Sequence, residues 1–527
     1  MAGLAKAGGL LSLSDTFRSG IPDALPTLVF DAAQAMDRVA LARAGAVGAL
    51  IDTPPDAADA SRKQILESPA AQGDVHAFLT WLVAAGQARL CWRLSWTDTQ
   101  GITFATYIDA VTGDEREHRK LTLDACGLAH PGRPHVEGVC RAAPQAALSS
   151  ADGLILPTLD PVPAPAPAAP QKAQAVTPFS MKVFAFPNES PKPQMPLTGT
   201  EPSSSISQST ITQAVVDATA SPNGWIESTY TKGNNVDAYL DTAPDNSASN
   251  SDRVQGTGSP LAFDFTIDLT TAPSGSDYRK GAVVNCFYWS NWFHDVMHGY
   301  GFDEASRNFQ SNNFGRGGTG GDRVLAEVQD GGGTNNANFS PDVDGNPGRM
   351  QMYVWTAPTP DRDGDLDATI VIHELTHGLS NRLAGGGDIS LSGAQAGGMG
   401  EGWSDFLAIA LLSQAGQPLN GRYGVGAYAT QNYSRGIRAV PYSTDTAYNN
   451  YKLGGNPGPH RSAGAPHRHL LVHHALGDAL RLGAEARLRS GQPHRHSTGD
   501  RRPQADALAT DLHRGARCHP HGRPGDQ

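Results

Sequence analysis

The chain has 527 residues, of which 39% are hydrophobic and 18% are charged, and its net charge at pH 7 is −11. This length allows roughly two to four domains with at least one large core. A negative charge balance without a long basic run argues against nucleic acid as the main partner. No stretch approaches the roughly 20 consecutive apolar residues that a membrane-spanning helix needs, so no membrane partner is expected.

The first residues give little information about the cellular compartment. They contain one lysine and a short apolar piece, Gly8 to Leu13, which is too weak for a convincing signal peptide. Two alternatives follow: a cytosolic protein, or an exported protein whose start has lost its signal. The five cysteines form no CxxC pair. A bridge between Cys126 and Cys140 would suit export, and unpaired buried thiols are the alternative.

Residues 1–150 are predicted to form a small α+β domain. Helical periodicity occurs at 32–46 and again at 75–85. Alternating, β-rich residues at 88–96 and 102–110 flank the turn sequence TDTQG, which predicts a hairpin. Helix and hairpin together indicate one compact module.

A linker rich in proline and alanine is predicted at 151–180. Its segment PTLDPVPAPAPAAPQKAQAVTP cannot form a packed core and predicts an extended, protease-accessible chain. A simple tether between domains and a maturation site between a prosegment and an enzyme are both consistent with this composition.

The remainder is predicted to form two lobes of an α+β protein. Residues 181–355 are rich in Ser, Thr, Asn, Gly and Pro and indicate a β-rich lobe, with one buried, aromatic-rich helix at 282–300. Residues 356–455 are predicted to be mainly helical, with helices at 367–383 and 398–415.

The sequence HELTH in the first of these helices suggests a metal site. His373 and His377 are four residues apart and therefore lie on one helix face, where both rings can reach the same point. Zinc accepts such an imidazole pair and needs a third protein ligand, which leaves a fourth position for water. Glu374 can act on that water as a general base.

The following helix supplies carboxylates at a suitable offset. Glu401 comes twenty-four residues after His377, and Asp405 lies one turn further on. A carboxylate at this offset can complete a two-histidine, one-glutamate site. Asp405 can accept a hydrogen bond from the far nitrogen of a zinc histidine. The sequence therefore predicts one catalytic zinc ion.

Two other segments imitate metal sites. HDVMH, from His294 to His298, lies in an aromatic-rich helix and lacks the glutamate, so it is interpreted as structural. DRDGDLD, from Asp361 to Asp367, imitates a calcium loop, which needs a bidentate glutamate at its twelfth position. Counted from Asp361 that position is Ile372, which cannot be a ligand. Counted from Asp363 it is Glu374, which is already assigned as the general base. A helix N-cap at Asp367 is the preferred interpretation, and the sequence leaves structural calcium possible but gives no support for it.

With these residues in place, the chain resembles the fungalysin family of secreted zinc metalloendopeptidases, which is related to thermolysin. The similarity extends beyond HELTHGLSNRL and GMGEGWSDF to DRVLAEVQDGGGTNNANFSPDVDGNPGRMQMYVW, NNFGRGG and RAVPYSTD, and it covers about residues 181–445. The resemblance implies zinc ligands at His373, His377 and Glu401, and a catalytic base at Glu374, in a thermolysin-like two-lobed catalytic domain.

The resemblance also implies an edge strand that pairs with the substrate backbone. TNNANF is similar to that strand, with Asn336 and Ala337 as the expected peptide-binding residues. The hairpin within residues 1–150 resembles the propeptide of the family, which favours a maturation site after the linker. A secreted, monomeric enzyme acting on proteins or peptides, and inhibited by its own propeptide, is therefore expected.

The last 72 residues, 456–527, depart from the family. They hold ten of the eighteen histidines and eleven arginines but no Lys, Phe, Tyr, Trp, Ile or Met. We interpret this segment as a frameshifted or disordered tail, because a one-base shift permits PTFTEARDAILMADQ, which resembles the ends of fungalysins. A metal-binding, histidine-rich tail is the alternative. His474 superficially resembles the family's oxyanion-stabilising histidine and is not assigned.

Three rival interpretations are kept. The first is another thermolysin-type peptidase, which GMGEGWSD and NNFGRGG disfavour. The second is a zinc-binding pseudoenzyme that lacks a complete C-terminal lobe. The third is a non-catalytic cell-surface module built around the N-terminal hairpin, for which Glu374→Gln would change nothing.

Overall fold

The protein is described from a computed structural model, which covers residues 2–4, 10–13, 26–43, 48–53, 62–84, 87–124, 176–385, 391, 394–414, 416–418 and 420–449. It contains both helices and sheets, as the sequence predicts for an α+β protein. The expectations for Cys126, Cys140, His474, most of the linker and the tail 456–527 lie outside the described residues. Among the described residues, no helix is both long and apolar enough to cross a membrane.

A six-stranded antiparallel sheet forms the N-terminal part of the structure, in the strand order β3-β4-β5-β6-β7-β8. The helix α1 (Ala32–Arg43) packs on it through a face of buried alanine, methionine and valine. We call this unit the N-terminal sheet. Its strands are β3 (Leu50–Thr53), β4 (Gln64–Glu67), β5 (Gln72–Ala84), β6 (Gln87–Thr97), β7 (Thr103–Asp109) and β8 (Glu115–Lys120).

The predicted hairpin at 88–96 and 102–110 is confirmed, because β6 and β7 pair antiparallel across a short turn. The predicted helix at 75–85 is wrong, because this segment belongs to β5. Its side chains alternate between buried and half-buried positions from Val75 to Leu82, which is the period of a strand with one covered face. Pairing with β4 and β6 along this length outweighs the local helical pattern.

The main body comprises the described residues 176–449, and its largest sheet has the order β12-β14-β16-β15-β9. The strands β12 (Val236–Leu240), β14 (Val324–Val328) and β16 (Arg349–Met352) are parallel, and β15 (Ala337–Ser340) is antiparallel to β16. The main body also contains a three-stranded sheet in the order β11 (Ser209–Thr212), β10 (Phe179–Val183) and β13 (Leu261–Phe263). A two-stranded sheet is formed by β17 (Val354–Trp355) and β18 (Arg362–Asp363).

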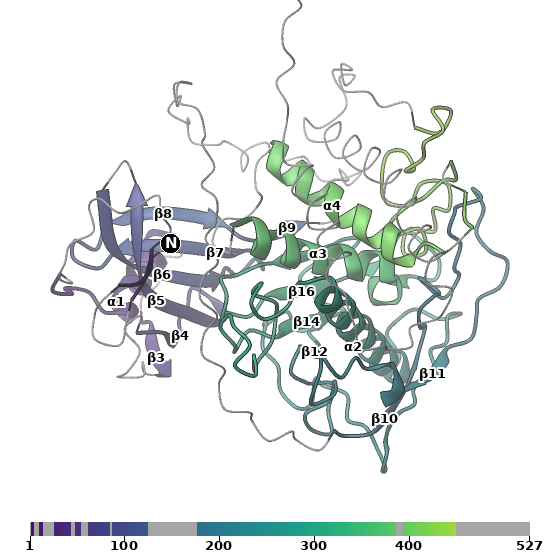
Figure 1. Ribbon diagram of the computed structural model, residues 1–527, viewed down its shortest axis with the longest axis horizontal. Coiled ribbons are helices and arrows are strands. Elements are labelled where there is room, and N and C mark those ends of the chain that lie inside the picture. Colours follow the sequence, from purple (N-terminus) through teal and green to yellow (C-terminus); the bar gives the residue numbers. More distant parts are fainter. Residues whose placement is uncertain are drawn as a thin grey trace, which may run out of the picture.

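Three long helices accompany these sheets: α2 (Ser276–Gly299), α3 (Ala368–Gly385) and α4 (Ala394–Leu412). The predicted buried helix at 282–300 and the two helices of the HELTH region are thereby confirmed, with bounds shifted by a few residues. In Figure 1, α2, α3 and α4 lie together in the main body, next to β12, β14 and β16. Their apolar side chains and those of the sheets form one large core.

The strand β9 (Leu123–Asp124) links the two parts of the molecule. It follows β8 in the chain but pairs antiparallel with β15 of the main body, with Leu123 opposite Phe339 and Asp124 opposite Asn338. Figure 1 shows β9 beside α3, on the side of the main body that faces the N-terminal sheet. The edge of the main sheet is therefore occupied by a segment from the N-terminal part of the chain.

Polar contacts accompany this strand pairing. The buried guanidinium of Arg93 on β6 lies 2.8 Å from the carboxylate of Asp342, which is also buried. Arg349 donates hydrogen bonds to the carbonyl oxygen of Gly101 and the hydroxyl of Thr103, each at 3.0 Å. Asn246 donates to Gln72 at 2.6 Å. The N-terminal sheet is therefore docked through specific, partly charged contacts.

Candidate metal centre

The helix α3 begins with a capping interaction that fixes its first turn. Asp367 precedes the first helical residue, and its carboxylate accepts hydrogen bonds from the backbone N–H and the hydroxyl of Thr369. The second carboxylate oxygen accepts the backbone N–H groups of Tyr428 and Ala429. This supports the N-cap interpretation of Asp367, and it anchors the helix to the segment that follows α4.

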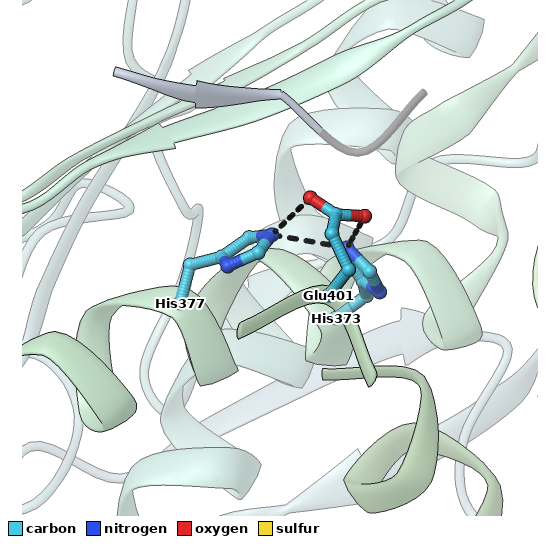
Figure 2. Close-up of side chains that lie close together, drawn as sticks. All are labelled: His373, His377 and Glu401. Carbon is cyan, nitrogen blue, oxygen red and sulfur yellow. Dashed lines mark hydrogen bonds and ion pairs between the residues drawn. The ribbon is translucent and has the colours of Figure 1, made fainter. Parts of the chain in front are cut away.

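Two histidines that follow this first turn of α3 converge with a glutamate of α4. His373 and His377 on α3 have their Nε2 atoms 3.1 Å apart. Glu401, from α4, places Oε1 at 3.4 Å from His377 Nε2 and Oε2 at 3.6 Å from His373 Nε2. Figure 2 shows the two rings and the carboxylate pointing to one place from two neighbouring helices. All three side chains are buried.

These distances fit a zinc ion. Ligands about 2.05 Å from a tetrahedral zinc lie roughly 3.3 Å from one another, and the three separations of 3.1, 3.4 and 3.6 Å scatter around this value. The donors are two imidazole nitrogens and a carboxylate, which zinc accepts. The residues predicted from the sequence as zinc ligands are therefore brought together in a geometry that suits the metal.

Asp405 fixes the protonation pattern of the first histidine. Its Oδ1 atom lies 2.7 Å from Nδ1 of His373 and accepts the proton there, which leaves the lone pair of Nε2 facing the other donors. Burial lowers the pKa of His373, although Asp405 opposes this shift. A neutral ring with its Nε2 lone pair available is the form that binds a metal.

Arg438 and Tyr442 are parts of the site that the motif analysis did not single out. Arg438 pairs with both oxygens of Asp405, at 2.6 and 2.7 Å, and lies 3.3 Å from Glu401. The hydroxyl of Tyr442 also donates to Asp405. Both residues lie in or beside the segment RAVPYSTD, which contributed to the family resemblance, but no residue spacing ties them to HELTH.

The two histidines and Arg438 together favour the ionised form of the two carboxylates. Burial alone would raise the pKa of Glu401, but His377, His373 and Arg438 lower it to about 2. Burial likewise opposes ionisation of Asp405, and Arg438 and His373 together hold its pKa well below the ordinary value. The site therefore presents two ionised carboxylates at neutral pH.

The remaining predicted residues lie close by in the chain or in the fold. Glu374, next to His373, is completely buried. Ala337 begins β15, and Asn336 precedes it with a buried Oδ1 atom that makes no hydrogen bond within the described residues. The strand β15 contacts α3, because the ring of Phe339 lies against the helix.

HDVMH does not form a second metal site of this kind. His294 contacts Asp295 and Gln310, and His298 lies 3.2 Å from Glu304. These contacts agree with the structural interpretation of the segment. Asp363 and Asp365, from the segment that imitates a calcium loop, are both buried. The carboxylate of Asp363 accepts hydrogen bonds from the backbone N–H of Asp365 and the side-chain amide of Gln329, and that of Asp365 accepts the backbone N–H of Gln329.

Two imidazoles one helical turn apart, with a carboxylate from the next helix, are the donor set of thermolysin-type zinc hydrolases. Comparison with known proteins agrees with this class. The family described as Fungalysin metallopeptidase (M36) matches residues 194–461, just over half of the chain. The chain therefore belongs to the fungalysin metallopeptidase family, as its sequence resemblance predicted.

Individual relatives are proteins named as extracellular metalloproteinases. The chain is 46% identical over 225 residues to extracellular metalloproteinase MEP of Fusarium vanettenii, which covers 42% of this chain and 35% of that protein. It is 45% identical over 240 residues to the MEP of Pyricularia oryzae, covering 44% and 37%. With extracellular metalloproteinase 3 of Trichophyton soudanense it shares 45% identity over 223 residues, covering 42% and 56%. The chain thus spans little more than a third of the first two relatives.

Proposed function

We propose that this chain is an exported, zinc-dependent metalloendopeptidase that hydrolyses peptide bonds in proteins and is made as a precursor inhibited by its N-terminal part. The observation that carries the proposal is the convergence of His373, His377 and Glu401 at distances suited to zinc, with Glu374 adjacent, in a member of the fungalysin family. Export is supported by relatives named as extracellular enzymes.

The protein's own residues divide the chemical work. His373, His377 and Glu401 would hold the zinc, which when bound supplies a Lewis acid that polarises the scissile carbonyl. Glu374 takes the proton of the attacking water and later delivers it to the leaving amine. Asp405 keeps the proton of His373 on Nδ1, and Arg438 keeps Asp405 ionised. Cleavage also requires that the substrate peptide is held with its scissile bond within reach of Glu374.

The strand β15 is the proposed peptide-binding edge, with Asn336 and Ala337 as its binding residues. An extended peptide that adds to a sheet edge forms hydrogen bonds through its backbone, whatever its side chains are. This mode of binding suits an endopeptidase, which binds the middle of a substrate chain. The pairing of β9 with β15 supports this, because it shows that the edge accepts an antiparallel strand. The unpartnered Oδ1 atom of Asn336 offers an additional acceptor.

The same pairing supports inhibition by the N-terminal part, for which we propose residues 1–150 as the propeptide and 151–180 as the linker that is cut. While β9 lies on β15, a substrate cannot pair there. In Figure 2 a bluish-purple strand, the colour of the N-terminal segment in Figure 1, is drawn above the three labelled side chains. The Arg93–Asp342 pair and the contacts of Arg349 hold the N-terminal sheet against the main body.

Casein hydrolysis tests the peptidase proposal. The chain, after its linker has been cut, should hydrolyse casein in proportion to its zinc content. Glu374→Gln should retain zinc but lose activity by about 10²–10⁴-fold, which is the usual contribution of a general base. Equal activity in the parent protein and Glu374→Gln would contradict the proposed role and would favour the cell-surface module.

A zinc-binding pseudoenzyme is the second candidate, and the composition of residues 456–527 is the observation that favours it. The family match ends at residue 461, close to where this composition begins. Zinc bound without casein hydrolysis would identify the pseudoenzyme. A version with the reading frame of the tail restored should then be active, if the tail is a frameshift product.

Inhibition by β9 has its own test. Proline at position 123 removes a backbone N–H and disfavours strand pairing. Leu123→Pro in the uncut chain should raise casein hydrolysis toward the level of the cut protein. Val111→Pro, in an exposed turn of the same sheet, is the matched control and should leave the uncut chain inhibited. An uncut parent that is already fully active would contradict inhibition altogether.

A further inference from the structure

A second group of acidic side chains lies in the main sheet, on elements that contribute nothing to the zinc-ligand set. Asp241 follows the end of β12, Glu327 is on β14, and Asp330 comes shortly after β14. One oxygen from each carboxylate lies within 4.8 Å of the others, and all three residues are buried. Parallel pairing of β12 with β14 brings them together, because Leu240 is opposite Val328.

Some of the carboxylate oxygens are satisfied by the protein. The oxygens of Asp241 accept the backbone N–H groups of Asp245 and Asn246, at 3.1 and 3.0 Å. The hydroxyl of Tyr239 donates to Oε1 of Glu327 at 3.0 Å. These bonds hold the side chains in place, and each oxygen keeps a second lone pair for another ligand.

Oε2 of Glu327 is the exception. It is buried and accepts no hydrogen bond from an N–H donor of the described residues, and its neighbours are the carboxyl group of Asp330 and the guanidinium of Arg349. A buried carboxylate oxygen without a hydrogen-bond partner is costly and calls for a compensating ligand. Burial raises the pKa of Glu327 to about 8, and burial together with Asp330 raises that of Asp241 to about 6.

Arg349 is the cation beside the group, and it is shared with other acceptors. Its Nε atom lies 3.7 Å from Oε2 of Glu327, beyond hydrogen-bond distance. Its terminal nitrogens are directed to Asn246, Gly101 and Thr103, of which the last two belong to the N-terminal sheet. One distant guanidinium therefore faces three buried carboxylates.

We infer that Asp241, Glu327 and Asp330 bind one divalent cation of the hard, oxygen-preferring class, with calcium as the best fit. Oxygens about 2.4 Å from a calcium ion lie at most about 4.8 Å apart, which the three carboxylates satisfy. The donors are oxygens only, without nitrogen or sulfur, which disfavours zinc. The cation neutralises the buried charge that Arg349 leaves uncompensated.

Calcium titration of the full-length chain carrying Glu374→Gln tests this inference without any dependence on peptidase activity, and this background prevents self-cleavage. With zinc bound and other divalent cations removed, calorimetry should detect saturable binding of one calcium ion, and the melting temperature should rise by a few degrees. Adding Glu327→Gln should abolish both responses. Without calcium, that variant should melt within a few degrees of the parent, because burial already favours the uncharged form of Glu327.

Asp268→Asn is the matched control, because Asp268 is an exposed carboxylate that bonds only to the neighbouring Thr270 in the described contacts. It should keep the full calcium response. If Glu327→Gln does not fold, Asp241→Asn serves as the second variant and should weaken calcium binding at least tenfold. The inference is overturned if the parent binds no calcium, or if the parent and the folded site variant respond equally.

Discussion

Nδ1 of His373 lies 2.7 Å from Oδ1 of Asp405, although the two residues come from different helices. This contact connects the metal-facing ring of α3 to α4, and Arg438 completes it from a third segment. The orientation of a metal ligand is thus set by a carboxylate that is itself held by a buried cation. The arrangement predicts that the site is sensitive to residues that would not touch the zinc.

Asp405→Ala should reduce zinc affinity by about 10- to 100-fold, which is the usual effect of removing the partner of a metal-bound histidine. It should also lower stability by about 3–5 kcal/mol, because Arg438 is left buried without its main partner. Competition with a chelator and thermal unfolding measure the two effects. Ser404→Ala is the control, since the buried hydroxyl of Ser404 makes no hydrogen bond within the described residues. An unchanged zinc affinity in Asp405→Ala would contradict the orienting role.

Gly378, directly after His377, allows β15 to approach α3. A Cβ at this position would lie 2.7 Å from the ring of Phe339 and 2.9 Å from that of Phe309, and both rings are buried. Gly378→Ala gains about 1 kcal/mol of helix propensity but should lose more by overpacking, which costs about 1–3 kcal/mol. We therefore expect a net loss of stability in thermal unfolding.

Gly299→Ala is the matched control for this substitution. Gly299 is the last residue of α2, whereas Gly378 lies inside α3, and nothing lies within 4 Å of the Cβ added at Gly299. This variant should be neutral or slightly more stable. A stable Gly378→Ala protein with unchanged zinc content would show that the two aromatic rings can move aside.

Arg93→Met should weaken docking of the N-terminal sheet. The change leaves Asp342 as an unpaired buried carboxylate, which typically costs about 3–5 kcal/mol. The uncut chain should then show a higher basal casein hydrolysis than the parent. Arg43→Met removes a more exposed pair with Glu115, worth at most about 1 kcal/mol, and should leave inhibition intact. Equal inhibition in both variants would mean that the buried pair contributes nothing to docking.

Docking should also weaken in acid because of His76. This residue of β5 has a buried Nδ1 atom without a hydrogen bond in the described contacts, and burial lowers its pKa although Asp342 and Asp74 act in the opposite direction. Lys63 and Arg93 add to the lowering. We expect undocking to expose His76 to water and to return its pKa toward the ordinary value, so docking should be strongest above pH of about 6.5 and should decline below it.

After the linker is cut, dissociation of the N-terminal part can be followed by size-exclusion chromatography between pH 7.5 and 5. The dissociation constant should rise by at most about tenfold per pH unit, as expected for one proton. His76→Gln should remove this dependence. Asp342, whose pKa Arg93 lowers against the effect of burial, adds a further loss only at more acidic pH. A parent protein with pH-independent docking over this range would contradict the prediction.

Features that depend on nearby residues were predicted well. His373 and His377 meet because helical geometry places residues four apart on one face, and the 88–110 hairpin forms because its strands are adjacent in the chain. The helix predicted at 75–85 was wrong for the complementary reason. Its local pattern is compatible with a helix, and pairing with the strands on either side decided in favour of β5.

The sequence by itself determined the family, the main helices and the identity of the candidate zinc ligands, because these follow from local periodicity and from motifs of fixed spacing. Only the tertiary structure decided that Arg438 holds Asp405, that β9 lies on β15, and that Asp241 meets Glu327 and Asp330. Each of these contacts joins segments that are distant in the chain. Their formation depends on how whole strands and helices pack, and no short-range pattern of residues encodes it.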